Sequence, residues 1–185
     1  MNADQHLVYA VADLRRSPTA ARDFALMLVE AAQRELAQAE TFEQAREVTN
    51  KTRGFMEYLR RNHTDRHAVG LLAAQWLRGV RWMGTWLEAN VNHDGGGDRK
   101  SESRDETAMR DLPDGVTKSQ SSRWQRVASV HEQDFDLWIH EILTGDDVPS
   151  LAGLYRIWQM YFAPDEERAR QCCRPDLDDA HGHAH

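Results

Sequence analysis

Residues 66–91 read RHAVGLLAAQWLRGVRWMGTWLEANV, and this stretch decides the fold class. Apolar side chains recur there at steps of three and four residues, which is the period of an α-helix. They form two stripes, so we expect a long helix that packs against two partners, one from this chain and the other from a second subunit. The first stripe holds Leu72, Trp76, Val80, Met83 and Leu87, and the second holds Trp82 and Trp86.

The tryptophans of these stripes are the candidate oligomer-interface residues. Tryptophan has a large apolar surface, so it is costly to leave in water and is enriched at interfaces. The chain has six tryptophans in 185 residues. We therefore expect Trp76, Trp82 and Trp86 to contribute to a homo-oligomer, with a dimer favoured.

Two more helices are predicted upstream of this stretch. Residues 17–39 start with Ser17 as N-cap and Pro18 in the first turn, followed by small apolar residues at helical spacing. Residues 41–61 start with Thr41-Phe-Glu-Gln44, the pattern of a capping box. Together with residues 66–91 they predict a long-helix body over residues 1–92. LVYAVA within residues 1–16 allows a strand or a helical turn, and we favour a helix or a loose arm.

Downstream, HDGGGDRKSE at residues 93–102 predicts a flexible linker, because three successive glycines and dense charge cannot hold a helix. Residues 103–163 predict a smaller helical unit, and residues 164–185 an acidic tail that ends in histidines. The sequence therefore predicts an all-α protein in which long antiparallel helices precede a small helix-turn-helix-like bundle. The helices of this bundle are expected at residues 103–112, 117–129, 131–143 and 149–162.

Composition limits the class of protein further. No apolar run approaches the roughly 20 residues that cross a bilayer, and the first residues lack the basic start of a signal peptide. The two cysteines, Cys172 and Cys173, are adjacent and poorly placed for a structural disulfide. We therefore expect a cytoplasmic protein without a membrane partner.

The net charge of −7 conceals local clusters of opposite sign. Residues 46–81 contain eight Arg or Lys against three acids, and residues 117–130 contain Lys118, Arg123 and Arg126 without any acid. From residue 132 onwards there are twelve acids against four Arg. A negative total therefore leaves room for an anionic partner at the positive segments.

The segment around residues 103–143 has the layout of a helix-turn-helix DNA reader. Pro113-Asp114-Gly115 predicts a turn, and Thr117-Lys-Ser-Gln120 predicts the capping box of the next helix. The first turns of that helix carry short polar and basic side chains, which let a backbone approach base edges. The candidate DNA-binding residues are Lys118, Ser119, Gln120, Ser122 and Arg123 near bases, with Arg126 on phosphate.

Ser121 departs from the usual pattern, because the residue five positions after Val116 is normally aliphatic and packs on the first helix. Trp124 is the residue that can cover this gap. A capped helix after a glycine turn is also common in all-α proteins, so a purely structural three-helix unit stays an alternative for this segment.

Three segments carry a resemblance: TFEQAREVTNKTRGFMEYLRR, LLAAQWLRGVRWMGTWLEAN and DLPDGVTKSQSSRWQRVASVHEQDFDLWI. In this order, over about residues 40–140, they resemble poorly characterised phage and mobile-element proteins with a C-terminal helix-turn-helix-like segment. The resemblance implies a mobile-element setting and a DNA-related role, and Ser121 belongs to the family's pattern. Trp82 and Trp86 depart from it, at positions that are usually charged or Leu. The match is strongest at Lys118, Gln120, Ser121, Ser122, Arg123, Trp124 and Gln125.

Signals for metal binding and catalysis are weak. His63 and His67 are four residues apart, but spacing fixes no third ligand, so a surface pair is the better interpretation. Cys172 and Cys173 with the histidines of the tail resemble a metal-binding tract of no selected geometry. No phosphate-binding glycine loop, nucleophile elbow or HEXXH motif is present. We expect no enzyme activity, no cofactor and no metal site.

The sequence thus favours a non-enzymatic regulator that reads duplex DNA with residues 117–129. One alternative is a protein-interaction module that uses the Trp-rich helix at residues 66–91 and the acidic C-terminal half. A weaker alternative is a DNA-packaging or partition adaptor, which requires ring assembly. Each alternative keeps the predicted all-α fold.

Overall fold

The computed structural model describes residues 17–62, 65–91 and 112–161. All regular elements in these ranges are α-helices and none is a β-strand, which confirms the predicted all-α class. The N-terminal arm, the linker at 93–102, the tail at 164–185 and the predicted helix at 103–112, except Leu112, lie outside the described residues. The elements are α2 (Pro18–Ala37), α3 (Phe42–Arg61), α4 (Arg66–Asn90), α5 (Lys118–Ala128), α6 (Glu132–Thr144) and α7 (Leu151–Tyr161).

The predicted capping boxes at the starts of α3 and α5 are confirmed. In α3, the Gln44 amide N–H donates to Thr41 Oγ1 at 3.3 Å, and Gln44 Oε1 accepts from the Thr41 amide at 3.1 Å. In α5, the Gln120 amide donates to Thr117 Oγ1 at 3.2 Å, and Gln120 Oε1 accepts from the Thr117 amide at 3.0 Å. Side chains adjacent in the sequence thus satisfy amides that a helix start leaves unpaired.

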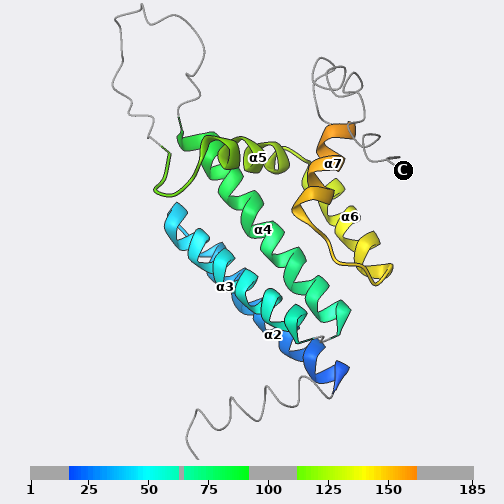
Figure 1. Cartoon of the computed structure of the whole chain (residues 1–185). Helices are drawn as coiled ribbons and strands as arrows, with labels where there is room; N and C mark the ends of the chain where they lie inside the picture. The colour runs from blue at the N-terminus through cyan, green and yellow to red at the C-terminus, as the bar shows by residue number, and fades with distance from the viewer. Residues whose placement is uncertain (1–16, 63–64, 92–111, 162–185) are drawn as a thin grey trace, which may run out of the picture.

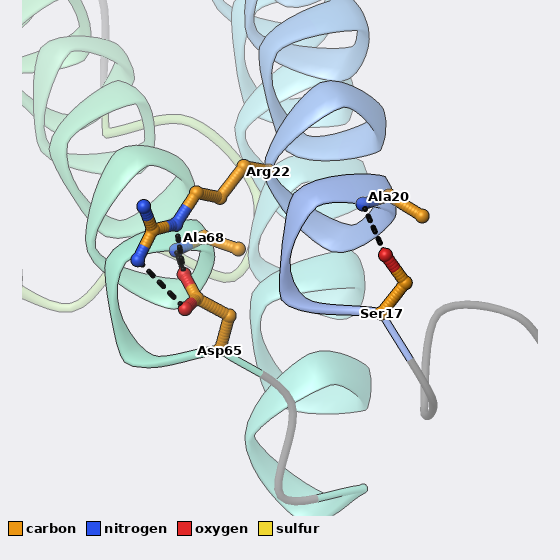
Figure 2. Close-up of polar contacts among 5 residues, drawn as sticks. All are labelled: Ser17, Ala20, Arg22, Asp65 and Ala68. Atoms are coloured by element: carbon orange, nitrogen blue, oxygen red, sulfur yellow. Dashed lines mark hydrogen bonds and ion pairs between the residues drawn. The ribbon is translucent and has the colours of Figure 1, made fainter.

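Asp65 caps α4 and also ties it to α2 (Figure 2). Its Oδ1 accepts from the Ala68 amide at 3.0 Å, and its carboxylate receives two hydrogen bonds from the Arg22 guanidinium, at 2.8 and 3.0 Å. Arg22 lowers the pKa of Asp65 most, and the Ala68 amide adds to this, against the opposing effect of burial. The charged carboxylate therefore holds the starts of two helices together.

Helix α4 is the central element (Figure 1). Short connections at 38–41 and 62–65 make α2, α3 and α4 an antiparallel three-helix bundle. On the other side of α4, α5 packs near the C-terminal end of α4. Helix α6 runs beside α4 in the opposite direction, since Asp136 near its start bonds to Arg78 and Leu143 near its end lies beside Gly70. Helix α4 is therefore covered on two sides by its own chain, by α2 and α3 on one side and by α5 and α6 on the other.

Two glycines let α4 approach its neighbours closely. A Cβ on Gly79 would overlap the side chain of Thr49 on α3, and a Cβ on Gly84 would overlap the backbone carbonyl of Trp124 on α5. Glycine is therefore required at both positions for α3 and α5 to lie this close to α4. The glycines sit on the two sides of α4, where they fix how closely α3 and α5 approach it.

One apolar core joins the long helices to the segment beyond the predicted linker. Buried Phe42 and Leu87 belong to the same cluster as Val127, Phe135 and Trp158. A second cluster, centred on Leu59 and Leu72, fills the opposite end of the bundle. The two stretches that the sequence separates at residues 93–102 thus pack on each other in the described structure.

Candidate nucleic-acid interface

Helix α5 has one exposed polar face and one buried face. At 3.6 residues per turn, Lys118, Ser119, Ser122 and Arg123 lie within an arc of about 140°, and all four are exposed. The opposite side buries Ser121 and Val127 and presses the Trp124 backbone against Gly84. The predicted base-reading residues, apart from Gln120, therefore share one surface on a helix anchored to α4.

Gln120 has a structural task. Its Oε1 accepts from both the amide and the hydroxyl of Thr117, so its side chain folds back over the helix start. The residue thereby fixes the first turn that carries Lys118 and Ser119.

Arg126 lies towards α7. Its Nη1 donates to Tyr155 Oη at 2.7 Å, and its guanidinium lies 5.0 Å from the centre of the Trp158 ring. Arg123 lies 5.9 Å from the centre of the Tyr155 ring but stays exposed. Helix α7 therefore borders the C-terminal half of the polar face, and the first two turns of α5 are its open part.

Ser121, where helix-turn-helix motifs usually have an aliphatic residue, is 5% exposed. Its hydroxyl accepts a hydrogen bond from Gln125 Nε2 at 3.0 Å, so the buried oxygen has a partner. The site is thus filled by a small, satisfied side chain, and α5 lies directly on α4. The helix predicted to precede α5 lies outside the described residues.

A cleft of about 460 Å³ opens between α3 and α5, over α4. Its apolar floor contains Trp76, Val80, Met83 and Trp124. Its polar walls are Arg46, Asn50 and Arg53 of α3 on one side and Ser119, Gln120 and Arg123 of α5 on the other.

Three arginines line this cleft, and each contacts an uncharged group. Arg46 Nη1 donates to the carbonyl of Asp114, Arg53 lies 5.8 Å from the centre of the Trp76 ring, and Arg123 lies near Tyr155. None of the three forms an ion pair within the described ranges. The cleft therefore concentrates positive charge in an acidic protein.

The sequence predicts a positive segment at residues 46–81 but does not place it beside α5. Arg46 and Arg53 are seven residues apart, two helical turns, so they lie on one side of α3. Their spacing in the sequence already indicates that they share a side of α3, whereas their position opposite Arg123 depends on how α5 packs across α4.

Arg78 and Arg81 of the same positive segment lie against α6. Arg78 pairs with Asp136, and Arg81 lies 4.4 Å from the centre of the Phe135 ring. Burial lowers the pKa of Arg81.

The three candidate interface tryptophans are partly buried and pack against the core of their own chain. The Trp86 ring centre lies 5.4 Å from that of Phe42, and Trp76 lines the cleft. More exposed apolar side chains occur elsewhere: Leu26, Met27 and Phe55 on α2 and α3, and Leu137, Met160 and Tyr161 on α6 and α7.

Within the described ranges, no three His, Cys, Asp or Glu side chains gather into a group that could hold a metal ion. His63 and the Cys/His tail fall outside these ranges. None of the described helices combines the length and apolar character needed to cross a membrane.

The fold and cleft define a class in broad terms: an all-α protein with an arginine-lined cleft beside an exposed, capped polar helix. Comparison with known proteins adds no family to this description, since no family model, curated protein or solved structure matches the chain.

Proposed function

We propose that this chain is a non-enzymatic DNA-binding protein that reads duplex DNA with residues 117–129. The observation that carries the proposal is the open polar arc formed by Lys118, Ser119, Ser122 and Arg123 on a helix anchored to α4. Recognition helices contact base edges with their N-terminal residues, and short polar side chains permit that approach. The phage or mobile-element setting suggested by the sequence is part of the same proposal.

The roles of the site residues follow from their surroundings. Arg123 and Lys118 contact base edges or nearby phosphates, with Ser119 and Ser122 adding short hydrogen-bonding groups. Gln120 holds the first turn, and Arg126 braces α5 against Tyr155. Arg46 and Arg53 lie across the cleft and have no ion pair among the described residues, so they are available to the backbone of the same duplex.

A dimer would place two copies of α5 on two half-sites and double the number of contacts. The exposed apolar residues Leu26, Met27 and Phe55 of α2 and α3 are further candidates for such pairing, in addition to the three tryptophans expected from the sequence. Size-exclusion chromatography with light scattering measures the oligomeric state. A ring would instead favour the packaging adaptor.

The test is duplex binding measured by fluorescence polarisation on DNA selected from a random-sequence pool. Arg123→Glu should weaken binding at least about 30-fold, because it replaces a charge-assisted contact with a repulsive one. Arg156→Glu is the matched control: it makes the same charge change at an exposed position of α7 and should have a much smaller effect. Binding should also fall steeply as salt rises. Absence of duplex affinity at low salt would refute the proposal.

A second candidate function rests on a separate groove of about 310 Å³ between α6 and α7. Leu137 and Tyr161 line it and are 58% and 69% exposed, with Asp134 and Glu141 beside them. An apolar groove edged by carboxylates suits an amphipathic helix with basic flanks. This groove corresponds to one part of the protein-interaction alternative, which combines the Trp-rich helix at residues 66–91 with the acidic C-terminal half.

The two functions separate in one pair of variants. Leu137→Asp should abolish capture of a basic amphipathic helix from a peptide library and leave duplex binding unchanged. Arg123→Glu should do the reverse. If no peptide in such a library depends on Leu137, the second candidate is wrong.

A further inference from the structure

We propose that the cleft between α3, α4 and α5 binds a small phosphorylated aromatic ligand, a free 5′-nucleotide. This proposal is separate from base reading by α5, because it rests mainly on Trp76 and on Arg46 and Arg53, to which the duplex proposal gives only contacts with backbone phosphates. Its ligand enters the cleft, whereas a duplex lies on the exposed arc of α5.

The size and lining of the cleft fit such a ligand. Small-molecule sites commonly enclose about 300–1,000 Å³ and combine an apolar lining with a few polar groups. Here a volume of about 460 Å³ has Trp76 and Trp124 on its floor, with Val80 and Met83 beside them. An indole offers a flat surface on which a nucleobase stacks.

The polar walls fit a phosphate group. Arg46 and Arg53 on α3 lie across the cleft from Arg123 on α5, so cationic groups line both walls. Guanidinium groups match phosphate oxygens through paired N–H donors. Because none of the three is neutralised by a described carboxylate, binding a phosphate breaks no described ion pair.

Further hydrogen-bond donors stand at the same place. Ser119 lines the cleft from the first turn of α5, where a helix start favours an anion. Asn50 lines the cleft from α3, where it lies between the two arginines in sequence. Arg53 lies 5.8 Å from the centre of the Trp76 ring, so a cation on one wall adjoins an aromatic side chain of the floor. A stacked base and a bound phosphate would thus occupy neighbouring parts of one cleft.

A duplex fits this cleft less well than a free nucleotide. The bases of a duplex are stacked on each other, so their faces cannot reach an indole without unstacking. A free nucleotide offers its base face and its phosphate together. A free nucleotide can therefore contact both the apolar floor and the arginines, whereas the sugar-phosphate backbone of a duplex contacts the arginines alone.

The experiment is calorimetric titration of the full chain with AMP, GMP, CMP and UMP, with tryptophan fluorescence as a second readout. At least one nucleotide should saturate, and its nucleoside and inorganic phosphate should each bind at least ten-fold more weakly. Arg53→Gln should weaken nucleotide binding about ten-fold or more, as the loss of a charge-assisted hydrogen bond implies. Arg60→Gln is the matched control on the same helix: it pairs with Glu57, does not line the cleft, and should bind like wild type.

Three outcomes would overturn the proposal: no saturation by any nucleotide at millimolar concentration, equal affinity for inorganic phosphate, or unchanged binding in Arg53→Gln. A single-stranded oligonucleotide that binds when no mononucleotide does would also overturn it, in favour of a polymer ligand. Both variants change exposed residues, and circular dichroism checks their fold. Duplex affinity is measured separately, so loss of the DNA function leaves the nucleotide result interpretable.

Discussion

Gly84 of α4 lies directly against the backbone carbonyl of Trp124 of α5, with no room for a Cβ between them. The Ala128 side chain closes the same contact from the next turn, 2.8 Å from where that Cβ would stand. This contact positions α5, and with it both the open polar arc and one wall of the cleft. A glycine more than thirty residues away in sequence therefore decides how the candidate site is displayed.

Gly84→Ala should destabilise the protein by about 2 kcal/mol or more, because overpacking outweighs the better helix propensity of alanine. Gly54→Ala is the matched control, since nothing lies within 4 Å of its Cβ position in the middle of α3. That change should stabilise by about 0.5–1 kcal/mol. Urea denaturation followed by circular dichroism measures both. Equal and favourable effects would show that α5 does not approach α4 this closely.

Asp65 should make the stability depend on pH. The pKa of Asp65 is lowered in the folded state, so its contribution is present above the unfolded pKa of about 3.9 and is lost as pH falls through the folded value. Asp65→Asn should therefore destabilise by about 1 kcal/mol at pH 7, and the difference from wild type should shrink as the pH falls below about 3.9.

Arg22 is the partner that tests this interpretation. Arg22→Gln should reproduce most of the loss at pH 7, and the double variant should lose less than the sum of the two single losses. Unfolding free energies at several pH values supply the comparison. Additive losses, or a difference that persists in acid, would contradict the ion pair.

Gln75 is 2% exposed, and its Oε1 has no hydrogen-bond partner among the described residues. Gln75→Met keeps the length of the side chain and removes the unsatisfied oxygen, so it should stabilise by about 1 kcal/mol. Gln75→Ala should instead destabilise, because it leaves a cavity. Thermal unfolding ranks the two variants against wild type. A destabilising Gln75→Met would mean that the amide is satisfied in solution.

Ser121 and Ser122 are neighbours with opposite surroundings, the first 5% exposed and the second exposed. Ser121→Leu introduces the aliphatic residue usual in helix-turn-helix motifs, yet it should destabilise by about 1–3 kcal/mol, because the larger side chain overfills a closed site. Ser122→Leu should change stability by less than about 0.5 kcal/mol. A stabilising Ser121→Leu would contradict this expectation, because it would mean that the site around residue 121 has room for the aliphatic residue of a usual helix-turn-helix motif.

Much of the fold follows from local signals. The caps at Ser17, Thr41 and Thr117 and the helical spacing of apolar residues predict α2 to α7 with small boundary differences. Of the candidate site, sequence reasoning places Lys118, Ser119, Ser122 and Arg123 on one helix. It does not separate them from Gln120 and Arg126, whose side chains turn to Thr117 and Tyr155. The Gln120 side chain folds back onto its own helix start, and Arg126 meets Tyr155 because α7 packs beside α5. Residue type alone encodes neither arrangement.

The sequence by itself determined which residues form helices, because capping and apolar period act over three to four neighbouring residues. Only the tertiary structure decided that α5 and α6 cover the second side of α4 and that Arg123 faces Arg46 and Arg53 across a cleft. Such pairings join residues far apart in the sequence, from Gly84 and Trp124 to Arg46 and Arg123, and they are set by which surfaces fit closely. The close contact between Gly84 and the Trp124 backbone positions α5 on α4, and α5 carries the candidate site.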